Sequence, residues 1–195
     1  EAKIESFLLF MNDKKVGIDY ANICNMDEVP CTFDIPRNRT VDEIGKDDIS
    51  IVTTGYEKMN FTIVLAVLAN GAKLKPMVIF KRKTKPKGNF PEGIIVTVNP
   101  KGWVDTEMMK FWLAEVWKKR SINTIFKPKS LLICDSARAH LTHEVNKEVQ
   151  LSNSQLGVIP GGLTKRIQPL DLTVNKSFKD KMKNEWCNWM KHDEH

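Results

Sequence analysis

The sequence lacks the features that mark several common classes of protein. No run of about 18 apolar residues occurs, so an ordinary transmembrane helix is excluded. The chain begins without an initiating Met and without a signal-peptide pattern, and we interpret it as a piece of a longer protein. None of the four cysteines forms a CxxC pair, so no zinc framework is predicted.

Several catalytic motifs are also missing. The sequence contains neither a P-loop nor a GxGxxG turn, which argues against those nucleotide-binding classes. Ser136 follows an apolar stretch but lacks the GxSxG setting of a hydrolase nucleophile. His140 and His143 lie three positions apart, yet no matching Cys or His pair precedes them, so ordinary core or solvated histidines are the default interpretation.

Charge, in contrast, is abundant and unevenly placed. The chain has 195 residues, a length that is enough for one domain with a sizeable core. Hydrophobic residues make up 42% and charged residues 28%, as in ordinary soluble proteins, and the net charge is +6. No acidic residue interrupts the segment from Lys73 to Gly88, which holds seven basic ones. Such a cluster favours a polyanionic partner, although a solvated hairpin tip is an equally good interpretation.

A buried strand ending in an acid stands at the centre of the pattern. Leu131 to Cys134 is apolar on both faces and leads directly into Asp135. Asp27 follows a similar stretch, and Asp171 stands at the N-terminal end of a predicted helix. A buried carboxylate is costly without a cation or another partner. Three acids at the ends of core elements therefore suggest a divalent-metal site.

Carboxylate oxygens are the ligands that Mg²⁺ and Mn²⁺ prefer, and two such ions can clamp the oxygens of a phosphoryl displacement. Asp27, Asp135 and Asp171 supply the acids that such a two-metal site needs, with Asp27 or Asp135 as the bridging ligand. Taken singly, each aspartate is better explained as a turn former or a helix cap, and it is the occurrence of three together that favours the metal site.

The remaining pattern predicts an α/β fold. An Asn70-Gly71 turn predicts a hairpin, and Pro30 is expected to stop the first strand. Strands precede helices and then alternate with them, which is typical of a mixed sheet with helices on its faces. Strands are predicted at 21–27, 49–54, 61–68, 75–80, 94–98, 131–135 and 156–159, and helices at 105–120, at 142–151 and from Asp171 onward.

The same pattern predicts one main domain. We assign residues 1–20 to an N-terminal arm or the end of a preceding region, residues 21–190 to the domain itself, and residues 191–195 to a disordered tail.

Three segments carry a family resemblance. Residues 25–28, 134–140 and 168–179 resemble the three acid-bearing blocks of pogo-type transposases of the DDE superfamily, which are related to mariner transposases, centromere protein B and jerky-like proteins. The last block is the most specific. The resemblance implies an RNase H-like fold, with a mixed five-stranded sheet flanked by helices.

The implied activity is DNA strand cleavage and transfer that depends on Mg²⁺ or Mn²⁺ in a two-metal site. Asp27 and Asp135 would hold the ions together, and Asp171 would complete the site. DNA is the implied partner, with phosphate contacts expected from basic residues near these blocks. These residues are Lys81, Arg82, Lys83, Lys85, Lys87, Lys165, Arg166 and Lys176.

The resemblance also leaves an alternative open. Domesticated transposases often serve as catalytically silent DNA- or chromatin-binding modules, sometimes with all three acids retained. Nuclear localisation is expected in both cases, as is a homodimer or a chromatin-protein partner, and no membrane association is expected. In this family, target sequence is read by a separate helix-turn-helix region that these residues do not include.

Overall fold

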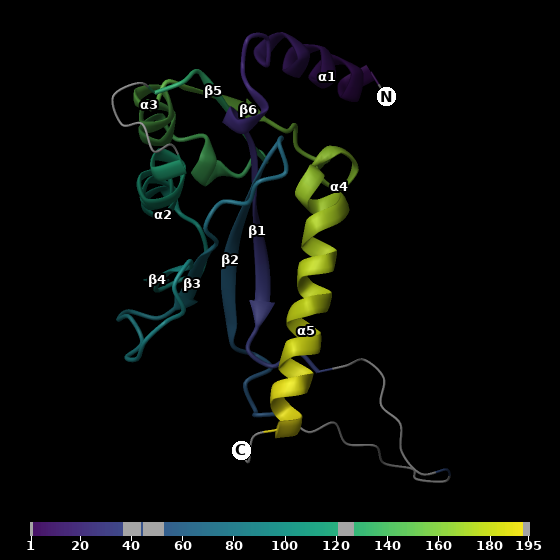
Figure 1. The fold of residues 1–195 in the computed structure, drawn as a ribbon, viewed down its shortest axis with the longest axis vertical. Coiled ribbons are helices and arrows are strands. Elements are labelled where there is room, and N and C mark those ends of the chain that lie inside the picture. The colour runs from purple at the N-terminus through teal and green to yellow at the C-terminus, as the bar shows by residue number, and fades with distance from the viewer. Residues whose placement is uncertain (1, 37–43, 45–52, 121–126, 193–195) are drawn as a thin grey trace.

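The computed structural model describes residues 2–36, 44, 53–120 and 127–192. It shows a mixed sheet with helices on both faces (Figure 1). Within this described part, no helix is long and apolar enough to cross a membrane. The predicted strand at 49–54 and the tail at 191–195 fall largely outside the described residues.

The sheet has six strands among the described residues, in the order β4-β3-β2-β1-β5-β6. The predicted α/β class with a mixed sheet is confirmed, but the implied count of five strands is wrong because β4 extends the sheet by pairing in parallel with β3. The strands are β1 (Ile23–Thr32), β2 (Asn60–Leu68), β3 (Met77–Lys81), β4 (Ile95–Asn99), β5 (Ser130–Cys134) and β6 (Ser154–Val158).

Local sequence explains the antiparallel half of this sheet. Asn70 and Gly71 connect β2 to β3, with Gly71 at φ 88° and the Asn70 side chain accepting a hydrogen bond from the backbone N–H of Ala72. Glycine adopts such a positive φ at little cost. The predicted turn is therefore confirmed.

The prediction that β1 stops near Pro30 is wrong, because β1 continues to Thr32. β1 pairs with β2 along Cys24–Thr32, but its parallel pairing with β5 covers only Ile23–Asn25. Beyond Asn25 no described strand pairs with the second edge of β1. A proline, which has no N–H, is tolerated on such an edge.

Helices cover both faces of the sheet (Figure 1). One face packs against α2 (Thr106–Trp112), the helical turns that continue it to Arg120, and α3 (His143–Leu151). Its core includes the fully buried Trp112 and Trp117. Both helices match their predicted spans.

The opposite face carries α1 (Ala2–Lys14) and α5 (Asn175–His192). Phe178 and Met182 of α5 pack on the apolar residues of β1 and β2. Ahead of α5 lie the short α4 (Thr164–Ile167) and a π-helical turn, Leu170–Val174. Asp171 lies in that π turn, so the last helix does begin near Asp171, as predicted.

Candidate metal centre

Adjacent acids of β1 serve opposite faces of the sheet. Successive side chains on a strand point to opposite sides. Asp27 therefore shares a face with Val29 and Cys31, which lie beneath α5 and beside it. Glu28 shares its face with Cys24 and Met26, toward α2 and α3. β1 consequently delivers two carboxylates to two different environments.

Beneath the start of α5, one amide joins two of the predicted acids. The Asn175 side chain donates through Nδ2 to Asp27 Oδ2 at 2.6 Å and to Asp171 Oδ1 at 3.0 Å. Asp27 is buried and Asp171 is exposed. The structure therefore brings these two sequence-predicted residues together at one point.

Asp27 has the most perturbed carboxyl group of this pair. Burial raises its pKa to about 7, and the hydrogen bond from Asn175 opposes that rise. The charges of Asp171 and Glu28 add to the effect of burial, and the value of about 7 includes all of these contributions. A carboxylate that is buried beside other acids and receives a neutral amide is stabilised in its charged form by a cation.

The third predicted acid, Asp135, has a charged partner. His140 contacts Asp135 Oδ1 through Nδ1 at 2.8 Å and Glu28 Oε1 through Nε2 at 2.8 Å. The backbone N–H of Ala137 also donates to Asp135 Oδ1. The ring of His140 is buried, on the short 3-10 helix Arg138–His140.

In this second cluster the pKa of the acid shifts in the opposite direction to that of Asp27. The hydrogen bond from His140 holds the pKa of Asp135 below its ordinary value, despite burial. Burial lowers the pKa of His140, but hydrogen bonds with Asp135, Cys134 and Glu28 outweigh burial and raise it well above neutral. The raised pKa favours an imidazolium at His140, whose single positive charge is shared by Asp135 and Glu28 and leaves the cluster with one negative charge.

Asn25 ties the three acid-bearing segments to one another. Its Nδ2 donates to the carbonyl of Ile133 at 3.2 Å, and its Oδ1 accepts from the backbone N–H of Leu170 at 3.1 Å. Asn25 stands two residues before Asp27, Ile133 two before Asp135, and Leu170 one before Asp171. This one buried side chain thus sets the relative positions of the three predicted acids.

The donor atoms fit hard divalent cations. Asp27 and Asp171 present oxygens to a common point, and Asp135 Oδ2 makes no hydrogen bond within the described residues, so it stays available to a ligand. Glu28, Asp135 and His140 also lie close together, with one possible ligand atom each within 4.8 Å of the others, but both ring nitrogens of His140 contact the carboxylates, so only carboxylate oxygens are left for an ion there. Carboxylate-rich sets of this kind suit Mg²⁺ and Mn²⁺.

Sequence reasoning missed Glu28, His140 and Asn175. The position of Glu28 could have been predicted from the sequence, because it directly follows Asp27 and adjacent side chains on a strand point to opposite faces of the sheet. His140 was expected to be an ordinary core or solvated histidine; it is buried, and its two carboxylate contacts were not foreseen. Asn175, four residues after Asp171, lies one helical turn along on the same face.

The predicted DNA-contacting residues are all exposed, but they lie in two places. Lys165, Arg166 and Lys176 flank Asp171 on α4 and α5. The other five lie at the end of β3 and in the loop that leads to β4. The sheet order separates β3 from β1 by β2, so this loop belongs to another part of the surface.

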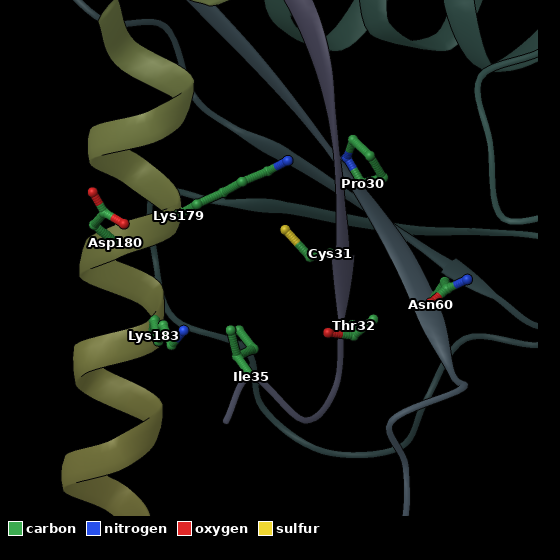
Figure 2. Close-up of a pocket in the computed structure, with 8 residues that line it drawn as sticks. All are labelled: Pro30, Cys31, Thr32, Ile35, Asn60, Lys179, Asp180 and Lys183. Carbon is green, nitrogen blue, oxygen red and sulfur yellow. The ribbon is translucent and has the colours of Figure 1, made fainter. Parts of the chain in front are cut away.

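A separate pocket lies between the far end of β1 and α5, lined by Pro30, Cys31 and Thr32 on one side and by Lys179 and Lys183 on the other. Figure 2 shows the Lys179 side chain reaching from α5 toward β1. Asp180 also lines this groove, so its charged residues are two lysines and one aspartate, and sequence reasoning did not identify it.

A family model that matches most of the chain identifies the family. The profile of the DDE superfamily endonucleases matches residues 58–195. This chain belongs to the DDE superfamily endonucleases. The matched part of this DDE domain includes Asp135 and Asp171, and Asp27 precedes it.

Curated relatives of the DDE domain carry pogo names, which confirms the resemblance. The human protein "Pogo transposable element with KRAB domain" is 34% identical over 172 residues, covering 88% of this chain and 28% of the relative. The human "Pogo transposable element with ZNF domain" is 29% identical over 137 residues, covering 70% of this chain and 10% of the relative. The DDE domain thus spans little more than a quarter of the first relative.

Solved structures show the same fold at low sequence identity, which confirms the implied RNase H-like class. The Mos1 transposase paired-end complex with left transposon end matches with a TM-score of 0.62 and 11% identity, over 98% of this chain and 54% of the other. The catalytic domain of Mos1 mariner transposase matches with a TM-score of 0.57 and 10% identity, over 100% and 81%. The mariner paired-end complex has also been solved with Mn and with Mg.

Proposed function

We propose that this DDE domain cleaves DNA strands and transfers them, using Mg²⁺ or Mn²⁺ held by Asp27, Asp135 and Asp171. The observation that carries the proposal is the convergence of Asp27 and Asp171 on the Asn175 amide, with Asp135 directly after the end of the neighbouring parallel strand β5. Asn25 pairs with Ile133, and Asp27 and Asp135 each follow their member of this pair by two residues. Family membership supports the same assignment.

The chemistry needs a phosphodiester, a hydroxyl nucleophile and a site for negative charge. When bound, divalent ions stabilise the attacking and leaving oxygens of the displacement. Asp27 must give up its proton before it can contribute a full charge, because its pKa is raised to about 7. The exposed Lys165, Arg166 and Lys176 are positioned next to Asp171 to bind DNA phosphates.

A nicking assay on supercoiled plasmid DNA in Mn²⁺ tests this function. Asp135→Asn should abolish nicking, because it removes a ligand charge while preserving the shape of the side chain. Asp180→Asn, an exposed acid on α5, is the matched control and should nick as the wild type does. Nicking by Asp135→Asn at the wild-type rate, or no nicking by the wild type, would contradict the proposal.

One observation favours a second candidate, a catalytically silent DNA-binding module. Asp135 forms an ion pair with the buried His140, which offsets part of its charge without a metal ion. In a silent module, Asp135→Asn leaves plasmid binding unchanged, and binding falls steeply with salt as phosphate contacts are screened. Measuring binding beside nicking therefore separates the two candidates. For either function, we propose a nuclear location because DNA is the partner.

A further inference from the structure

The amide group of Asn175 has hydrogen-bond partners at only one of its two ends. Its Nδ2 makes two hydrogen bonds to carboxylates, whereas its Oδ1 is buried and has no hydrogen-bond partner among the described residues. Asn175 is 8% exposed. A buried acceptor without a partner costs free energy, so its retention calls for an explanation.

Gln168 Oε1 is a second buried acceptor without a partner, so an unpaired oxygen alone does not single out Asn175. Gln168 donates from its other end to the carbonyl of Met26, a neutral backbone group. The opposite end of the Asn175 amide instead contacts two acids of the candidate metal centre. Among the residues that the structure describes, Asn175 alone therefore combines a buried oxygen that has no hydrogen-bond partner with a position between two carboxylates.

The two ends of an asparagine amide are nearly the same in shape, so a half-turn of the amide exchanges Oδ1 and Nδ2. Without a cation, Nδ2 faces Asp27 and Asp171 because three oxygens would repel one another. With a cation, the reverse orientation places three oxygens around one point. The amide therefore has one favoured orientation in each state.

The distances suit that exchange. Ligand oxygens at about 2.0–2.1 Å from Mg²⁺ in an octahedron lie about 2.9 Å apart along each edge. Nδ2 lies 2.6 Å from Asp27 Oδ2 and 3.0 Å from Asp171 Oδ1. An oxygen at the Nδ2 position would thus lie at edge distance from both carboxylates.

We propose that Asn175 is a ligand of the divalent cation held by Asp27 and Asp171, binding it through Oδ1 after the amide turns over. The proposal rests on the metal-binding part of the proposed function. Asn175 acts differently in the two states: it holds the two acids together as a donor without the ion, and it coordinates as an acceptor with the ion.

Isothermal titration of the 195-residue chain with Mn²⁺ provides the test. Asn175→Ala should weaken Mn²⁺ binding about tenfold or more, because it removes an oxygen ligand. Asn175→Asp should bind Mn²⁺ at least as tightly as the wild type, yet melt at a lower temperature without metal. The loss of two hydrogen bonds and the added charge beside Asp27 explain that lower melting temperature.

Asn184 offers the matched control, because it lies exposed on the same helix, nine residues further along. Asn184→Ala and Asn184→Asp make the same chemical changes about 13 Å away by helical rise, beyond the screening length at physiological salt. Both should bind Mn²⁺ within about twofold of the wild type. A change as large as that at Asn175 would show that charge or helix stability, rather than ligation, explains the Asn175 variants.

Crystals of the wild type soaked in Mn²⁺ give a second reading that needs no variant to fold. The expected result is an anomalous peak bound by Asp27 and Asp171, with Asn175 Oδ1 at ligand distance. A peak on the two acids with Oδ1 turned away overturns the inference alone, as does wild-type affinity in Asn175→Ala. Failure of the wild type to bind Mn²⁺ by either method overturns the proposed metal site together with this inference.

Discussion

On one face of β1, Asp27 and Asp171 share a neutral amide. Glu28, which points to the other face of β1, instead shares a buried imidazolium with Asp135. The pKa of Asp27 rises to about 7, while that of Asp135 falls below its ordinary value. The difference shows that His140 offsets part of the negative charge of Glu28 and Asp135, whereas the charge of Asp27 and Asp171 meets only a neutral amide. In this comparison Asp27 is the acid with most to gain from a metal ion.

Removing the imidazolium should have the largest effect on stability. In His140→Leu, Asp135 and Glu28 lose their shared cation and remain partly buried, so the free energy of unfolding should fall by about 3 kcal/mol in urea denaturation. His143→Leu, at an exposed histidine of α3, is the control and should change it by less than about 0.5 kcal/mol. Equal effects of the two substitutions would contradict the pairing.

Asp27 should produce the next largest effect, through pH. Between pH 4 and 7 the unfolded carboxyl ionises while the folded one keeps its proton, because its pKa is raised to about 7. The folded state then binds more protons, so without metal this residue's contribution to stability is present below pH 4 and is lost as pH rises toward 7.

The measurement is the unfolding free energy of the wild type and of Asp27→Asn at several pH values. Because asparagine does not titrate, the wild type should lose on the order of 2 kcal/mol relative to the variant between pH 4 and 7. A pH-independent difference would show that burial does not perturb Asp27. Excess Mg²⁺ should reduce the loss by stabilising the carboxylate.

Asn25 should have the smallest effect, and it links the two faces. Asn25→Ala leaves the Leu170 N–H and the Ile133 carbonyl without their partner, which should cost about 1–2 kcal/mol of unfolding free energy. Mn²⁺ affinity should also fall, since the acids lose their common anchor. Asn184→Ala serves as the control, and a wild-type Mn²⁺ affinity in Asn25→Ala would limit Asn25 to a purely stabilising role.

The sequence predicted the elements that carry the acids better than the contacts the acids make. Leu131 to Cys134 formed the expected strand because a continuous apolar run buried on both faces has few alternatives. Asp171 was placed correctly at the last helix by helical periodicity. Local pattern was sufficient in both cases.

Contacts between distant residues were not predictable from one sequence. Glu28 and His140 are 112 positions apart, and Asn175 is 148 positions from Asp27, so no local pattern reports their meeting. Pro30 misled the prediction because its effect depends on whether that edge of β1 is paired, which is a property of the whole sheet. The basic loop before β4 was recognised as a loop, but its distance from the acids follows from strand order.

The proline in β1 also affects the tendency of this protein to self-associate. A strand edge with free N–H groups can recruit an extended segment of another chain and begin aggregation. Pro30 removes one donor from the edge that β5 leaves uncovered, a few residues from Asp27. The residue expected to end the strand therefore permits a long β1 that remains a poor template for intermolecular β-pairing.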